Sequence, residues 1–143
     1  MASDKQRAAP PKVDAILLCD HVHKDGVTDK HTLIGVWDSL QSPSYPARFG
    51  SIGLYLNLIG LNGTYRFSII ILAPDLSTVV ARFELAPPLV APDPLHRHEV
   101  AVDIGGITFP APGRSTVRFL YNGLSAQEFT LTAFLLAQPP GGS

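Results

Sequence analysis

Apolar and polar side chains alternate along four segments of the chain, residues 64–73, 77–86, 114–121 and 124–135. A period of two is typical of β-strands that bury one face, because successive side chains on a strand point to opposite sides. The apolar positions on the expected buried face are Tyr65, Phe67, Ile69, Ile71, Val79, Ala81, Phe83, Leu85, Val117, Phe119, Tyr121, Phe129 and Leu131. We therefore expect four strands that pack onto one core.

Turn signals separate four further expected strands, at residues 12–23, 30–40, 50–59 and 97–104. Glycine, proline and aspartate recur between the strands at the short spacing typical of sandwiches and barrels. The pair Asn122-Gly123 predicts a type I′ turn that joins the last two strands. The whole pattern predicts an all-β fold, a single antiparallel β-sandwich of about seven to nine strands.

Proline-rich segments divide the chain further. Residues 87–94 contain four prolines, and because proline cannot donate to a strand ladder, this segment is expected to connect the two sheets. Residues 1–11 are predicted to be a disordered leader, and residues 137–143 a disordered tail. The β-sandwich domain is expected to span residues 12–136.

Composition narrows the possible partners and the compartment. The 143 residues include 11 basic and 12 acidic side chains, a net charge of −1, with no basic cluster. We therefore expect neither nucleic-acid binding nor membrane binding. A single cysteine, no apolar leader and no apolar run of about 20 residues favour a cytoplasmic protein.

Two neighbouring segments, residues 19–25 (CDHVHKD) and 30–38 (KHTLIGVWD), resemble the opening pair of strands of a family of small uncharacterised bacterial proteins of unknown function. Residues 63–67 and 106–123 are similar to the same family. The second of these stretches also resembles the closing hairpin of immunoglobulin-like sandwiches. The resemblance implies an immunoglobulin-like β-sandwich and carries no activity with it.

Three histidines are candidate metal ligands. His21 and His23 share one face of the first strand, and a hairpin across residues 25–30 would bring His23 roughly opposite His31. Cross-strand neighbours lie about 4.5–5.5 Å apart at Cβ, close enough for two imidazoles to share zinc or iron. The alternative is structural, with the imidazoles at the rim of the core bonded to backbone carbonyls or turn aspartates.

Catalytic motifs are absent from the sequence. Residues 50–53 (GSIG) lack the spacing of a nucleophile elbow, and Cys19 lies in an apolar strand, where a thiol is usually inert. The three glutamates, Glu84, Glu99 and Glu128, lie on different expected strands. We therefore expect a protein that is not an enzyme and needs no cofactor.

Aromatic side chains leave a carbohydrate-binding role open. Trp37, Tyr45, Tyr55 and Tyr65 are candidates for a face on which sugars stack, as in many β-sandwich binding modules. Core or rim positions are the alternative for all four.

Apolar side chains also occur on the face opposite the predicted core. Ile70, Leu72 and Val80 lie on that face of two adjacent strands, which suggests a patch covered by a loop of the same chain or by another subunit. The sequence therefore favours a non-catalytic module that acts through protein contacts, as a homodimer or in a larger assembly. A metal-binding protein and a carbohydrate-binding module are the alternatives.

Overall fold

The computed structural model describes residues 8–136, except for the side chains of residues 86 and 87. Eleven strands form the regular structure of these residues. The strands are β1 (Lys12–Lys24), β2 (His31–Trp37), β3 (Ser39–Ser42), β4 (Ala47–Phe49), β5 (Ile52–Ile59), β6 (Gly63–Leu72), β7 (Val79–Ala91), β8 (His98–Ile104), β9 (Ile107–Phe109), β10 (Gly113–Tyr121) and β11 (Leu124–Leu135). The predicted tail and residues 1–7 of the predicted leader lie outside the described residues. Within residues 8–136, no helix is long and apolar enough to cross a membrane.

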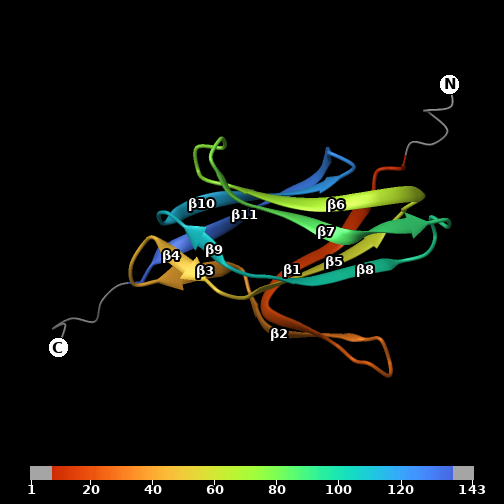
Figure 1. Cartoon of the computed structure of the whole chain (residues 1–143), viewed down its shortest axis with the longest axis horizontal. Coiled ribbons are helices and arrows are strands. Elements are labelled where there is room, and N and C mark those ends of the chain that lie inside the picture. The colour runs from red at the N-terminus through yellow and green to blue at the C-terminus, as the bar shows by residue number, and fades with distance from the viewer. Residues whose placement is uncertain (1–7, 137–143) are drawn as a thin grey trace.

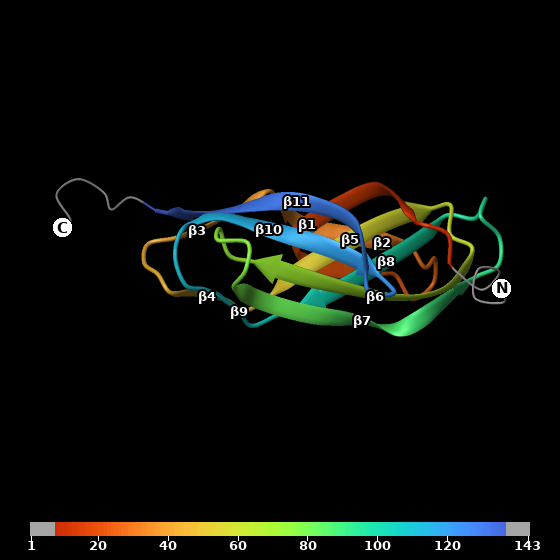
Figure 2. The ribbon, with the colours of Figure 1, turned by 90° about the horizontal axis from the view of Figure 1, so that it is seen from above.

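Two sheets face each other, as Figures 1 and 2 show. One has the strand order β2-β1-β5-β8 and the other β3-β11-β10-β6-β7, while β4 and β9 form a small third sheet. The predicted all-β sandwich is confirmed, with eleven strands instead of seven to nine. The added strands β3, β4 and β9 have only four, three and three residues, too few to show an alternating pattern.

Seven of the described strands are arranged as in an immunoglobulin sandwich, without a strand D and with β2 and β3 each added at one edge of a sheet. The strands β1, β5 and β8 take the places of A, B and E, and β11, β10, β6 and β7 those of G, F, C and C′. The chain crosses between the sheets after β7, as predicted for the proline-rich segment. However, β7 itself extends to Ala91, so residues 87–91 are strand, contrary to the prediction. Strand β7 tolerates its prolines because it is an edge strand, so that no neighbour pairs with its outer side. On its inner side, the pairing with β6 shifts register close to the prolines, between Tyr65 and Phe67.

The core lies between the two large sheets. Leu54, Leu56 and Leu58 of β5 are 0–1% exposed, and burying a leucine side chain contributes about 1.5–3 kcal/mol. On the facing sheet the ring of Phe67 lies 5.2 Å from that of Phe119 and stacks on Tyr65 at 5.5 Å. The predicted inner face of β6 and β10 is therefore confirmed.

Residues just before β1 are tied to the domain. Ala8 is buried, and the backbone amide of Ala9 donates to the carbonyl of Asn62. The hydroxyl of Tyr65 donates to the carbonyl of Ala9 at 2.5 Å. Residues 8–11 were expected to belong to the leader, and they contact the loop between β5 and β6.

The hairpin of β1 and β2 folds across the outer face of β5 and β8, below them in Figure 1. The backbone amide of Val22 donates to Asp103 Oδ1 at 3.2 Å, and the hydroxyl of Ser51 donates to the carbonyl of Asp20. Gly53 leaves room for this approach, because a Cβ there would lie 3.0 Å from a methyl group of Val22. This face of the sandwich is therefore partly covered by its own chain.

Candidate functional site

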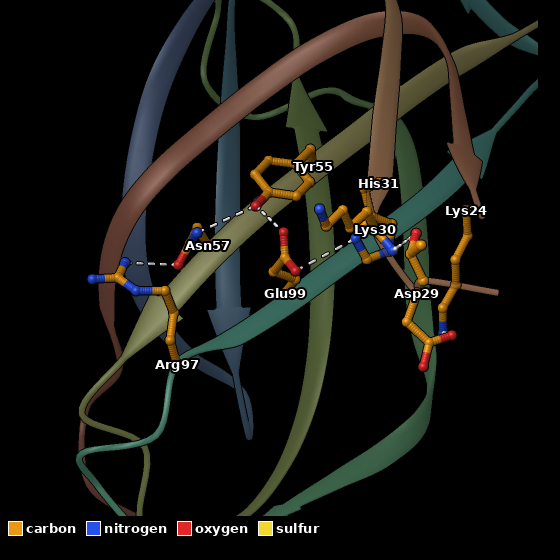
Figure 3. Close-up of polar contacts among 9 residues, drawn as sticks. Lys24, Asp29, Lys30, His31, Tyr55, Asn57, Arg97 and Glu99 are labelled. Carbon is orange, nitrogen blue, oxygen red and sulfur yellow. Dashed lines mark hydrogen bonds and ion pairs between the residues drawn. The ribbon is translucent and has the colours of Figure 1, made fainter. Parts of the chain in front are cut away.

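A chain of polar contacts crosses the outer face of β5 and β8 beneath the hairpin (Figure 3). Its members are Asp14, Arg97, Asn57, Tyr55, Glu99 and His31. Arg97 Nη1 donates to Asp14 and, at 2.9 Å, to Asn57 Oδ1, and the amide of Asn57 donates to the Tyr55 hydroxyl at 3.2 Å. The Tyr55 hydroxyl donates to Glu99.

Strand geometry assembles this network. In β5 the leucines point into the core, so Tyr55 and Asn57 point outward. Asn57 pairs directly with Glu99 of β8, which brings the carboxylate to the Tyr55 hydroxyl. His31 reaches the network from β2, with its ring 6.0 Å from that of Tyr55.

Burial and contacts inside the network shift the pKa values of two of its members. Burial raises the pKa of Tyr55, and its hydrogen bond to Glu99 raises it further. The hydrogen bond from Arg97 lowers the pKa of Asp14. Tyr55 is thus a neutral donor between a carboxylate and an amide. His31 Nδ1 is buried without a hydrogen-bond partner, 3.6 Å from Glu99 Oε1. With no activated nucleophile, this arrangement is suited to holding the hairpin in place.

The structure does not bring the three predicted metal ligands together. Lys24, not His23, is the cross-strand partner of His31, and His23 lies opposite Thr32. His31 is therefore on the face of the hairpin opposite to His21 and His23, and His21 Nδ1 lies 2.9 Å from Asp103 Oδ2. Between residues 8 and 136, no group of three or more His, Cys, Asp or Glu side chains is placed to hold a metal ion.

A second histidine pair lies at the start of β8. The rings of His96 and His98 are 5.0 Å apart, and His98 Nε2 is buried without a hydrogen-bond partner in the described chain. Burial, and then the neighbouring His96, lowers the pKa of His98 below its ordinary value of 6.5. The folded state therefore favours the neutral imidazole.

This histidine gives an expected pH dependence. Since its pKa is lower in the folded than in the unfolded state, its contribution to stability is complete above pH 6.5 and is lost as the pH falls through the folded pKa. His98→Leu, measured by urea unfolding from neutral pH to about pH 5, should lose less stability than the parent protein. His23→Leu, at an exposed position, is the matched control, and an equal effect of both substitutions would contradict the assignment.

The other candidates for chemistry are structural. Cys19 is fully buried, its thiol donates to the carbonyl of His21, and burial raises the thiol pKa. Glu84, Glu99 and Glu128 lie on β7, β8 and β11, as expected. Glu99 belongs to the polar network, which the sequence alone could not show because it depends on the pairing of β5 with β8.

The four candidate sugar-stacking aromatics do not share a face. Tyr65 is fully buried, and Tyr55 belongs to the polar network. The hydroxyl of Tyr45 donates to the carbonyl of Phe134 at 2.6 Å. Trp37 is half-buried beside a groove. The structure thus separates the predicted carbohydrate-binding set.

The predicted apolar interface is also rearranged. Leu72 is 6% exposed, and Val80 packs against the core. The register between β6 and β7 shifts after Ile71, so Val79 pairs with Leu72 and is 55% exposed, whereas Val80 turns inward. The predicted inward position of Val79 and outward position of Val80 are therefore wrong. Ile70 remains on the outer face, partly buried.

A different apolar surface lies along the hairpin and β1. Leu17, Ile34 and Val36 are 39%, 51% and 57% exposed. Leu17 and Val36 line a groove of about 400 Å³ together with Trp37 and with Phe129 of β11. We call Leu17, Ile34, Val36 and Trp37 the hairpin patch. The alternation of Ile34 and Val36 with Leu33 and Trp37 was visible in the sequence, as was the absence of charge between them.

Comparisons with known proteins identify a family and two solved structures that are similar to this chain. The model of a family of unknown function (DUF6941) matches residues 14–134. No curated protein matches the chain. Among solved structures, the chain is similar to the alkylpurine DNA glycosylase AlkC of Pseudomonas fluorescens, bound to DNA that contains an abasic site analogue. The two chains are 12% identical with a TM-score of 0.52, and the match covers 87% of this chain and 30% of the glycosylase. An immunoglobulin-like protein of Pseudomonas aeruginosa is 16% identical with a TM-score of 0.44, over 88% and 98% of the two chains. This chain thus spans less than a third of the glycosylase.

Proposed function

The chain belongs to DUF6941, a family of unknown function, so its role must be inferred from the structure itself. We propose that it is a non-catalytic β-sandwich module that associates with a second copy of itself through β2. The observation that carries this proposal is the free edge of β2. This strand ends its sheet and pairs only with β1, so one side of its backbone has no partner among the described residues.

The edge lacks the side chains by which proteins usually block strand pairing, and its one irregularity is Gly35, which has a left-handed φ of +67° and no cross-strand partner in β1. Natural edge strands are short or carry lysine, proline or inward charges. The β2 strand has seven residues, HTLIGVW, with no proline and no Lys, Arg, Asp or Glu. Its outward side chains Ile34 and Val36 are more than half exposed. Such an edge favours pairing with another strand.

A second copy fits this edge by symmetry. In an antiparallel pair centred on Ile34, that residue meets its own counterpart on the two-fold axis and Thr32 faces Val36, so no like charges are opposed. The hairpin patch adds Trp37 of β2 and, on the neighbouring strand β1, Leu17. The hydrophobic contact and the new backbone hydrogen bonds both support an isologous dimer.

We expect Ile34→Lys to convert a dimer into a monomer. Two lysines would face each other at the axis, and the dimer dissociation constant should rise at least about tenfold, which is about 1.4 kcal/mol. Sedimentation velocity over a wide range of protein concentration measures this change. Leu95→Lys, at a position 86% exposed in the turn before β8, is the control and should leave the constant unchanged. A parent protein that stays monomeric throughout, or an Ile34→Lys variant that still dimerises, would reject the proposal.

A further inference from the structure

Four arginines lie on the outer face of the five-stranded sheet. Arg66 is on β6, Arg82 on β7, and Arg114 and Arg118 on β10. Each alternates with inward side chains, and the register sets Ile70 of β6 directly between Arg118 and Arg82. We call these four side chains the arginine face.

Most of this positive charge has no internal partner. Arg118 pairs with Glu128. Arg66, Arg82 and Arg114 are exposed and form no ion pair with any residue between 8 and 136. These three solvent-exposed guanidinium groups are therefore available to a partner of opposite charge.

The opposite face of the molecule differs. There Asp14 pairs with Arg97, Asp103 pairs with His21, and Glu99 accepts from Tyr55. Acidic groups on the outer face of the four-stranded sheet are thus held within the chain. On the arginine face, by contrast, three of the four arginines are exposed without an ion pair in the described part of the chain, next to one unpaired carboxylate, Glu84.

The spacing of the arginines suits an elongated partner. Arg82 and Arg118 are two strand spacings apart, about 10 Å. The register places Arg114 level with residue 74 of the chain, so Arg66 and Arg114 are separated by about 27 Å along the strands. A segment that runs parallel to β6 could contact all four, with Ile70 at the middle.

We propose that the arginine face binds an acidic segment of another protein. Guanidinium groups bind carboxylates in bidentate geometry, and the central Ile70 offers contact to an apolar side chain between the carboxylates. Glu84 and Glu128 lie on the same face, so the positive charges are interspersed with negative ones, which suits a partner with spaced carboxylates. The described side chains of β6, β7 and β10 present no aromatic ring on this face for base stacking, and the exposed Phe134 lies two strands from β6, on β11.

Binding of fluorescently labelled poly-L-glutamate, measured by anisotropy at low and at physiological salt, tests the proposal. The parent protein should bind, and more weakly at the higher salt. The double variant Arg82→Glu/Arg114→Glu should bind at least about tenfold more weakly. The double variant Lys12→Glu/Lys30→Glu makes the same change in net charge at exposed positions away from the face, and should stay within about twofold of the parent.

Several outcomes would overturn the inference. These are an absence of binding, an equal loss in both double variants, or tighter binding of oligothymidylate than of poly-L-glutamate, which would assign the face to nucleic acid. If the glutamate variant unfolds, as judged by circular dichroism, Arg82→Ala/Arg114→Ala replaces it with the same expected direction. Because Ile34→Lys leaves the face intact, that variant should still bind poly-L-glutamate, which separates this test from that of the dimer.

Discussion

Replacing Phe119 with alanine is expected to lower the free energy of unfolding by about 3–5 kcal/mol, a large part of the total stability of a domain this size. Phe119 is fully buried in β10, between β6 and β11, and its ring lies 5.2 Å from that of Phe67. Truncation removes apolar surface from the core and leaves a cavity, because the rigid strands on both sides cannot close over it.

Urea unfolding followed by tryptophan fluorescence measures this loss. Phe134→Ala makes the same chemical change at a side chain that is 48% exposed, and should cost less than about 1 kcal/mol. Equal losses for the two variants would contradict a core placed between the two sheets.

Replacing Gly53 with valine is the second large expected effect. A Cβ at Gly53 would lie 2.6 Å from Cys19 Sγ and 3.1 Å from the backbone carbon of His21. Something must therefore move, and overpacking of this kind costs about 1–3 kcal/mol. Because Val22 also lies against this position, the hairpin should be displaced from β5, with faster amide hydrogen exchange at Val22, whose amide donates to Asp103.

A paired substitution isolates the cause. Cys19→Ala removes the nearest atom, so combining it with Gly53→Ala should recover part of the stability that Gly53→Ala loses alone. Gly26, in the hairpin turn, has nothing within 4 Å of its Cβ position, so Gly26→Ala should leave the hairpin in place. If the cysteine substitution recovers nothing, the close approach of β1 to Gly53 is not the source of the cost.

Alternation predicted the strands well wherever the register is regular. Phe67, Ile69 and Ile71 point inward as expected because β6 pairs with β10 without a shift. The same reasoning failed for Val79 and Val80, since one extra residue at the irregularity beside Ile71 reverses which side chain faces the core. Periodicity contains no signal for such a bulge.

The histidine prediction failed by a single position. In the structure the backbone amide of Asp25 donates to the carbonyl of Lys30, so Lys24 and not His23 pairs with His31. A slip of one residue moves a side chain to the opposite face of a strand pair. Turn residues alone did not distinguish the two registers, and the metal site depended entirely on that choice.

Surfaces that depend on strand order were beyond sequence reasoning. The arginine face requires that β10, β6 and β7 be neighbours, although β10 is separated from β6 by three other strands in the sequence. The polar network likewise needs β8 next to β5. By contrast, the uncharged edge of β2 is a local property, and it can be read directly from the residues between His31 and Trp37.

The pairing of β3 with β11 has a consequence for synthesis on the ribosome. Residues 39–42 pair in parallel with residues 132–135, so this ladder joins segments that are far apart in the sequence. Strand β10 also needs β11, its antiparallel partner, to complete its pairing. A nascent chain can assemble β1, β2 and β5 early, but closure of the second sheet must await emergence of the last strand from the exit tunnel. Until then, β3 and β10 remain open to chaperones and to mispairing with neighbouring nascent chains.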